Sequence, residues 1–141
     1  MPRNVRWIGH VGTANHNVIN SSAHMVLNIN RESMAKVGYS PPTRVFEAAG
    51  AAACLITDAW LGIEQFYEPE REVLVAHSSD EIVRYLREIG PEQAQEIGCA
   101  MHKRALRDHT YRLRAREVDD ILRRSLMTAR PASESLVESA R

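Results

Sequence analysis

Glu47 is the residue whose type and position point most directly to chemistry. It lies within residues 40–50, where most of its neighbours are small or apolar. A carboxylate in such surroundings is costly unless it has a partner, so we expect Glu47 to be held for a ligand group such as the hydroxyls of a ribose. The alternative is an ordinary surface ion pair with Arg44, three residues earlier in the same helix.

The start of this helix has features that suit an anion. Ser40 is a good N-cap and Pro41 suits the first turn, so we expect a helix over residues 40–52. The amides and the dipole of a helix start favour a phosphate, and Arg44 could add a positive charge. A helix of this kind that feeds a buried strand predicts an α/β ligand site.

Histidines and one tryptophan offer further candidates. His10 follows a predicted strand, where an imidazole could act as a general base or bind a phosphate, although a local hydrogen bond in a loop is the alternative. His102 and His109 have no third ligand at a zinc spacing, so we expect no metal. Trp60 follows another predicted strand and either stacks on a base or caps the core.

The elements that position these residues alternate along the chain. Apolar runs predict strands over residues 5–8, 25–29, 53–58 and 72–76. Helical patterns predict helices over residues 14–22, 40–52 and 62–67, with a polar connection over 30–39. This alternation predicts an α/β fold, a Rossmann-like half-domain with about four mainly parallel strands, helices on both faces and a helical C-terminus.

In such sheets, ligands bind beyond the carboxyl ends of the strands. The residues at those ends are Gly9, His10 and Gly12 after the first strand, Asn28, Asn30 and Arg31 after the second, Thr57, Asp58 and Trp60 after the third, and His77 and Ser78 after the fourth.

Three helices are predicted after residue 78. Ser78 and Glu81 form a capping box at the first of them, and Pro91 starts the second. The third has a stripe that we expect to face inward, with its arginines outward: Tyr111, Ala115, Val118 and Leu122. We expect one domain over residues 1–126 and a disordered tail over residues 127–141, where periodicity ends.

Composition is that of a soluble globular protein. The 141 residues are 44% hydrophobic and 26% charged, with a formal net charge of zero, so no general attraction to nucleic acid or to an anionic membrane is expected. No apolar run has the length of a membrane span and the N-terminus lacks a signal-peptide core, so we expect a cytoplasmic protein. Cys54 and Cys99 have no metal-ligand spacing and are expected to be buried thiols.

Residues 43–58 resemble the region around the second glutamate of group 1, GT-B type glycosyltransferases, in which a Glu-Ala start, a small-residue helix and a strand entry follow one another. More narrowly, the segments 27–30, 40–46, 56–60 and 62–64 resemble the spore-maturation CgeB-type subgroup. The resemblance extends over roughly residues 4 to 124 as a pattern of residues.

This resemblance implies a C-terminal, donor-binding half in which the second glutamate contacts the ribose of a nucleotide-sugar, a role that falls to Glu47. The family's first glutamate, eight positions earlier, faces the donor sugar, and this chain has Tyr39 there. The family's Gly-x-Pro is replaced by residues 52–54. The implied donor-binding residues are Glu47, Arg44, Ser40, Thr43, Tyr39, Arg31, Asp58 and His10.

The function expected from this resemblance is the donor-binding part of a glycosyltransferase, with a nucleotide-diphosphate sugar as substrate and with no metal or other cofactor. We expect the chain to need an acceptor-domain partner for a complete catalytic cycle. A homodimer would also cover the sheet edge and apolar surface of a half-domain. The alternative is a non-catalytic Rossmann-like module that uses its helical C-terminus to bind another protein.

Overall fold

A computed structural model describes residues 2–128 of the chain. The chain divides into two compact units, Met1–Arg107 and Asp108–Arg141. The first unit holds a sheet of three parallel strands in the order β1-β2-β3. These strands are β1 (Val26–Asn28), β2 (Leu55–Asp58) and β3 (Leu74–Ala76).

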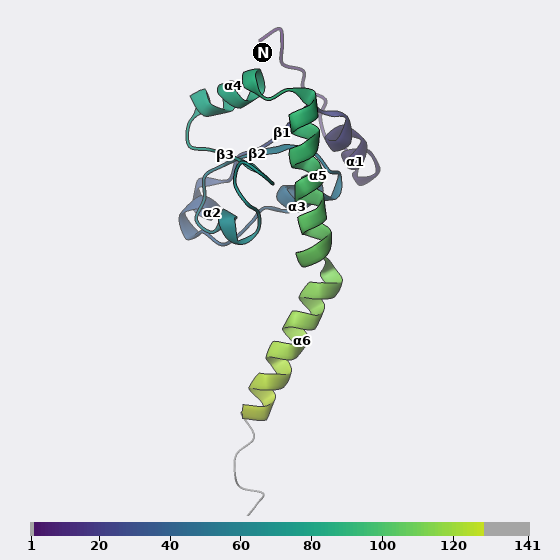
Figure 1. Cartoon of the computed structure of the whole chain (residues 1–141), viewed down its shortest axis with the longest axis vertical. Helices are drawn as coiled ribbons and strands as arrows, with labels where there is room; N and C mark the ends of the chain where they lie inside the picture. The colour runs from purple at the N-terminus through teal and green to yellow at the C-terminus, as the bar shows by residue number, and fades with distance from the viewer. Residues whose placement is uncertain (1, 129–141) are drawn as a thin grey trace, which may run out of the picture. The chain divides into compact units, whose positions relative to one another are not determined.

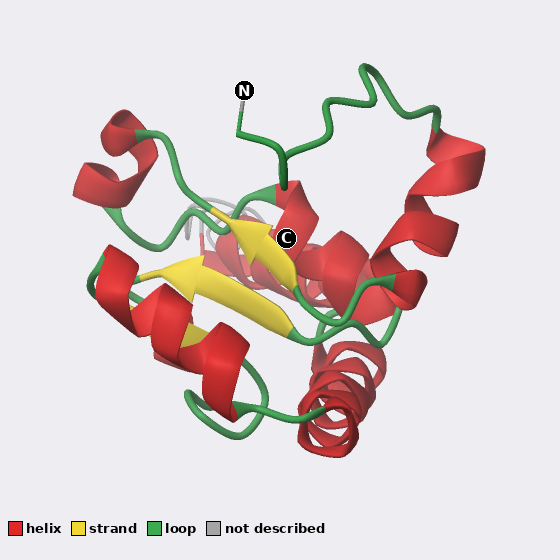
Figure 2. Ribbon diagram, turned by 90° about the horizontal axis from the view of Figure 1, so that it is seen from above, coloured by secondary structure: helices red, strands yellow, loops and turns green. Residues whose placement is uncertain are grey.

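Helices flank this sheet. They are α1 (Thr13–Ser22), α2 (Glu32–Val37), α3 (Thr43–Gly50), the short 3-10 helix η1 (Ile63–Gln65), α4 (Ser79–Glu88) and α5 (Pro91–Asp108), whereas α6 (Tyr111–Thr128) belongs to the second unit. In Figure 1, α4 lies on one side of the strands and α2 and α3 lie on the other. Figure 2 shows the strands pointing the same way with helices on both sides. The predicted α/β class, with a parallel sheet and a helical C-terminus, is confirmed.

Strands β2 and β3 bury both faces, because alternate side chains enter two separate clusters, whereas β1 leaves Leu27 46% exposed. Leu55 and Val75 belong to the cluster on the α3 side, whereas Ile56 and Ala76 belong to the cluster on the α4 side. Parallel strands covered on both faces are apolar throughout, which is why these runs could be recognised as strands. None of the helices among residues 2–128 combines the length and the apolar character that crossing a bilayer requires.

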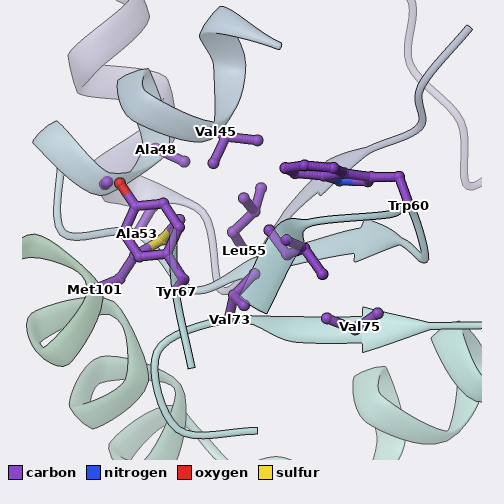
Figure 3. Close-up of a cluster of buried hydrophobic side chains, with 11 residues drawn as sticks. Val45, Ala48, Ala53, Leu55, Trp60, Tyr67, Val73, Val75 and Met101 are labelled. Atoms are coloured by element: carbon purple, nitrogen blue, oxygen red, sulfur yellow. The ribbon is translucent and has the colours of Figure 1, made fainter. Parts of the chain in front are cut away.

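The two clusters share one helix. In the α3-side cluster, Figure 3 shows Trp60 at one end and Met101 of α5 beside Tyr67 at the other. Earlier in the same helix, α5 contributes Ala94 and Ile97 to the α4-side cluster, two turns and one turn before Met101. Helix α5 therefore packs against both layers of the first unit.

The turn from α3 into β2 ends the helix with a Schellman motif. The Ala52 amide donates to the Ala49 carbonyl at 3.2 Å, and the Ala53 amide donates to the Ala48 carbonyl at 3.0 Å. Ala52 has a φ of 53°, the left-handed conformation that glycine usually occupies in this motif. Gly98 of α5 lies directly against this turn, and a Cβ atom there would overlap the Ala52 carbonyl oxygen.

Tyr85 connects α4 to the chain before β3. Its hydroxyl donates to Oε1 of Glu70 at 2.6 Å and lies 3.1 Å from the Val75 carbonyl oxygen. Burial, followed by the hydrogen bond to Glu70, raises the pKa of Tyr85 to about 12. The phenol therefore stays protonated in the folded chain at pH values where a free tyrosine ionises.

Replacing Tyr85 with phenylalanine should lower the free energy of unfolding by about 1–3 kcal/mol, because the Glu70 carboxylate loses its donor. The raised pKa adds a pH dependence: the stability that the protonated phenol contributes is fully present below pH 10 and is lost as the pH rises toward about 12. Urea unfolding at several pH values measures both effects. Tyr39→Phe, at a side chain 53% exposed whose ring is kept, is the matched control and should change neither. Equal stability of wild type and Tyr85→Phe would contradict this account.

Two predicted segments differ from the observed structure. Residues 5–8 do not form a strand; Val5, Trp7 and Ile8 are exposed, and the sheet of the described residues does not extend to them. A strand forms only where its backbone N–H and C=O groups can hydrogen-bond to a neighbouring strand, and the amino-acid composition of a segment does not show whether such a neighbour exists. The connection over residues 30–39 contains α2, a short helix that its polar sequence did not indicate.

The start of α3 also differs. The helix begins at Thr43 with Pro42 as its N-cap, so Ser40 is not the cap that its type predicted. The reason is the pair of prolines, because each proline holds the residue before it in an extended conformation. The N-cap half of the predicted capping box of α4 is confirmed, since the Glu81 amide donates to Oγ of Ser78 at 3.3 Å, whereas the Glu81 carboxylate accepts from the His77 amide at 2.6 Å.

The predicted inward stripe of α6 is not buried. No residue of this helix is buried, and Val118 and Leu122 are 54% and 57% exposed. The tail predicted over residues 127–141 begins within α6, which runs to Thr128, and residues 129–141 lie outside the described part. Of the two cysteines, Cys54 is buried, which raises the pKa of its thiol to about 11, but Cys99 is only partly buried.

Candidate functional site

The carboxyl ends of β1 and β2 carry a connected group of polar side chains. The Asn28 side-chain amide donates to Oγ1 of Thr57 at 3.2 Å and to Oδ1 of Asn30 at 3.3 Å. Asn28 and Thr57 are 3% and 0% exposed, so each satisfies the other in the interior. The sequence predicts these residues at the carboxyl ends of the strands, and that is the edge of the sheet at which they lie.

Asp58 is part of the same group and is oriented by it. Its Oδ1 accepts a hydrogen bond from the Asn30 backbone amide at 3.0 Å and lies 3.4 Å from the Thr57 hydroxyl. Both contacts use one carboxylate oxygen. Within residues 2–128 no partner engages the second oxygen, so a partly buried carboxylate is fixed in place with one acceptor to spare.

Two loops meet at this edge of the sheet. The Tyr39 backbone amide donates to the Leu61 carbonyl at 2.7 Å, and the Tyr39 ring lies against Gly62. Gly62 has a φ of 98°, which side-chain-bearing residues rarely adopt. Tyr39, which replaces the glutamate expected from the resemblance, therefore stands beside the carboxyl end of β2 and is 53% exposed.

A shallow hollow of about 480 Å³ lies beyond the ends of β2 and β3. Its lining combines apolar groups with three titratable side chains: Ala59, Trp60, Leu61, Ile63, Glu64, Pro69, Glu70, Val75 and His77. Trp60 is 5% exposed and belongs to the core cluster, so the second of its two predicted roles, capping the core, is the correct one.

Glu47 lies on the exposed face of α3. Its Oε2 is 3.4 Å from Nδ1 of His16 on α1, and the two side chains are 41% and 38% exposed, with Glu47 the more accessible. The expectation that this helix has little solvated surface is wrong, because its apolar residues gather on one face and leave the other to Glu47 and Arg44. The side-chain contact of Glu47 is with His16, and the alternative ion pair with Arg44 does not form among the described residues.

The sequence alone did not identify His16 as a candidate functional residue. Its pairing with Glu47 depends on how α1 packs against α3, and neither local spacing nor residue type reports that contact. Such pairs become visible only when the fold is known.

The remaining predicted residues are exposed and fall in three separate parts of the chain. Ser40, Thr43 and Arg44 lie at the start of α3, where no side chain caps the helix. Arg31 is the N-cap of α2, and His10 lies in the N-terminal segment. Hydrogen bonds of the described residues join Asp58 to Asn30 and Thr57 but do not extend from this group to Glu47 or His10. In the same range, no three His, Cys, Asp or Glu side chains converge as a metal site.

The topology places the start of α3 at the same edge as Asp58. Tyr39 contacts the loop after β2, four residues before α3 begins, and the turn at the other end of α3 leads into the start of β2. Helix α3 therefore runs back along the sheet from the carboxyl edge to the amino edge. Its uncapped amides and Arg44 lie toward the polar edge, and Glu47 follows one turn later.

Comparison with known proteins gives one match. A family model described as glycosyl transferase-like matches residues 2–120, a span that contains the whole sheet and the first half of α6. Neither the curated proteins nor the solved structures yield a match.

Proposed function

This chain belongs to the glycosyl transferase-like family, whose model covers residues 2–120 of its 141 residues, and from that membership we propose that it binds the nucleotide-sugar donor of a glycosyl transfer. The binding site is the carboxyl edge of the sheet together with the exposed face of α3. The observation that carries this proposal is the accessible carboxylate of Glu47, one turn into a helix whose start faces that edge.

The groups present fit the parts of such a donor. Uncapped amides at Thr43 and the Arg44 guanidinium suit a diphosphate, because a helix start and a cation both stabilise negative charge. A carboxylate accepts hydrogen bonds from the two hydroxyls of a ribose, which is the role assigned to Glu47. The second oxygen of Asp58, held in a fixed direction by Asn30, offers another acceptor for a sugar or base donor.

His16 has a definite part in this proposal. In the free protein its Nδ1 lies 3.4 Å from Oε2 of Glu47, and both side chains are about half exposed. An exposed pair of this kind contributes little to stability, so a ribose can displace the histidine at small cost. Donor binding should therefore depend on Glu47 and not on His16.

The test is a titration of the full chain with UDP, GDP and their sugars, followed by NMR shifts and thermal stabilisation. Glu47→Ala should weaken donor binding roughly tenfold to a hundredfold, because hydrogen bonds from the ribose to a charged acceptor are lost. Addition of EDTA should leave the affinity unchanged, since no metal is expected.

His16→Ala is the matched control, because it removes the same side-chain contact but keeps the carboxylate. Binding that falls equally in both variants would mean that Glu47 acts only through the packing of α1 on α3. A folded protein that binds no nucleotide at about millimolar concentration would overturn the donor-site proposal.

We further propose that the chain belongs to the CgeB-type subgroup of GT-B glycosyltransferases and that an acceptor-domain protein is its catalytic partner. Reconstituted glycosyl transfer on mixing the two chains would support this assignment. The second candidate function is a non-catalytic module that binds another protein. The exposed apolar residues of α6 favour it, and it gains if the nucleotide titration fails while the chain is folded.

A further inference from the structure

Helix α6 presents an apolar stripe to the solvent. Tyr111, Ala115, Val118 and Leu122 follow one another at intervals of four, three and four residues, which places them on one face of the helix; we call them the α6 stripe. The largest of them, Tyr111, is 96% exposed, and no α6 residue is buried. This spacing is that of a seam between two helices.

The groove along α6 and the length of this helix also suit packing against a second helix. A shallow groove of about 410 Å³ runs along the stripe, bordered by Arg114 and Asp119. Grooves between side chains accept the side-chain ridges of a second helix. An isolated helix of 18 residues is marginally stable in water, so packing along the stripe would supply the stability that α6 lacks by itself.

We propose that α6 pairs with the α6 of a second copy of this chain, antiparallel, about a two-fold axis between Arg116 and Glu117. In this register Tyr111 packs against the partner's Leu122, and Ala115 packs against the partner's Val118. Each small side chain then meets a larger one and every layer is filled. A parallel, in-register pair would instead stack Ala115 on Ala115 and leave a gap.

Charges beside the stripe agree with the antiparallel register. Arg112 and Asp119 lie seven residues apart on the same side of the stripe. Flanking positions on the same side face each other in an antiparallel pair, so Arg112 meets the partner's Asp119, and symmetry produces this contact twice. Asp119 already pairs with Arg123 of its own helix at 2.8 Å, and the partner's arginine adds a second positive neighbour.

Sedimentation equilibrium of the full chain tests the pairing. The wild-type chain should be a dimer at about 100 µM, and Val118→Lys should be a monomer, because a charge would enter the seam. Asp119→Arg should raise the dissociation constant about tenfold, since two attractive pairs become repulsive. Asp120→Arg, which makes the same charge change on the outer face, should leave it unchanged.

The direction of the pair is tested by a charge exchange. Arg112→Asp combined with Asp119→Arg should restore the dimer, because the opposite charges face each other again. Rescue by Arg114→Asp instead would indicate a parallel pair and overturn the antiparallel register. A monomeric wild-type chain, or a dimer that Val118→Lys leaves intact, would overturn the pairing itself. Thermal unfolding of each variant checks that the sheet-containing unit is unchanged, and donor titration reports separately on the proposed function.

Discussion

Replacing Gly98 with alanine will lower the free energy of unfolding by about 3 kcal/mol or more. Helix propensity alone predicts the opposite sign, since alanine is favoured over glycine inside a helix by about 1 kcal/mol. The added methyl group would overlap the Ala52 carbonyl oxygen, which belongs to backbone and cannot rotate away. Helix α5 would have to withdraw from the turn that leads into the central strand.

Gly50→Ala provides the comparison for this substitution. Gly50 is also helical, but it lies at the exposed end of α3 and a Cβ atom there has nothing within 4 Å. It should therefore follow propensity and change stability by less than about 1 kcal/mol, in the stabilising direction. Urea denaturation of the two variants measures the difference. Similar stabilities for both would mean that α5 does not approach the turn as closely as the structure places it.

Replacing Gly62 with alanine should cost about 2–4 kcal/mol, for two separable reasons. A φ of 98° is strained for any residue with a side chain, and the new methyl group would overlap the ring of Tyr39. In a Tyr39→Ala background the overlap disappears and only the backbone strain should remain. A thermodynamic cycle of the two substitutions, measured by urea denaturation, separates the two contributions.

Gly9→Ala is the control for backbone strain alone. Gly9 also has a positive φ, 74°, but a Cβ atom at this position has no neighbour within 4 Å. Its replacement should cost only about 1 kcal/mol. If Gly62→Ala and Gly9→Ala cost the same, the new methyl group at position 62 does not overlap the Tyr39 ring as the structure indicates.

Strands β2 and β3 could be predicted because burial on both faces requires continuous apolar runs. Residues 5–8 have the same character and form no strand, which shows where this reasoning stops. Composition reports what a segment can bury, but hydrogen bonding to a neighbouring strand depends on the whole sheet. The start of α3 could have been placed correctly from the prolines at 41 and 42, whose effect on the preceding residue is local.

The candidate site was predictable where it follows from topology. Asn28, Thr57 and Asp58 lie where the ends of parallel strands must lie, and their hydrogen bonds confirm that they meet. The pairing of His16 with Glu47 is different, because it depends on the packing of two helices. The α6 stripe is a third case: periodicity identified the apolar face correctly, but it carries no information on what covers that face.

Helix α5 contributes Met101 to one hydrophobic cluster and Ile97 to the other, and it touches the turn between α3 and β2 through Gly98. Loss of either layer would therefore remove support from the helix on which the other layer depends. The two faces of the sheet are energetically coupled through a single rigid element, so the first unit should unfold cooperatively, without an intermediate that keeps one layer intact.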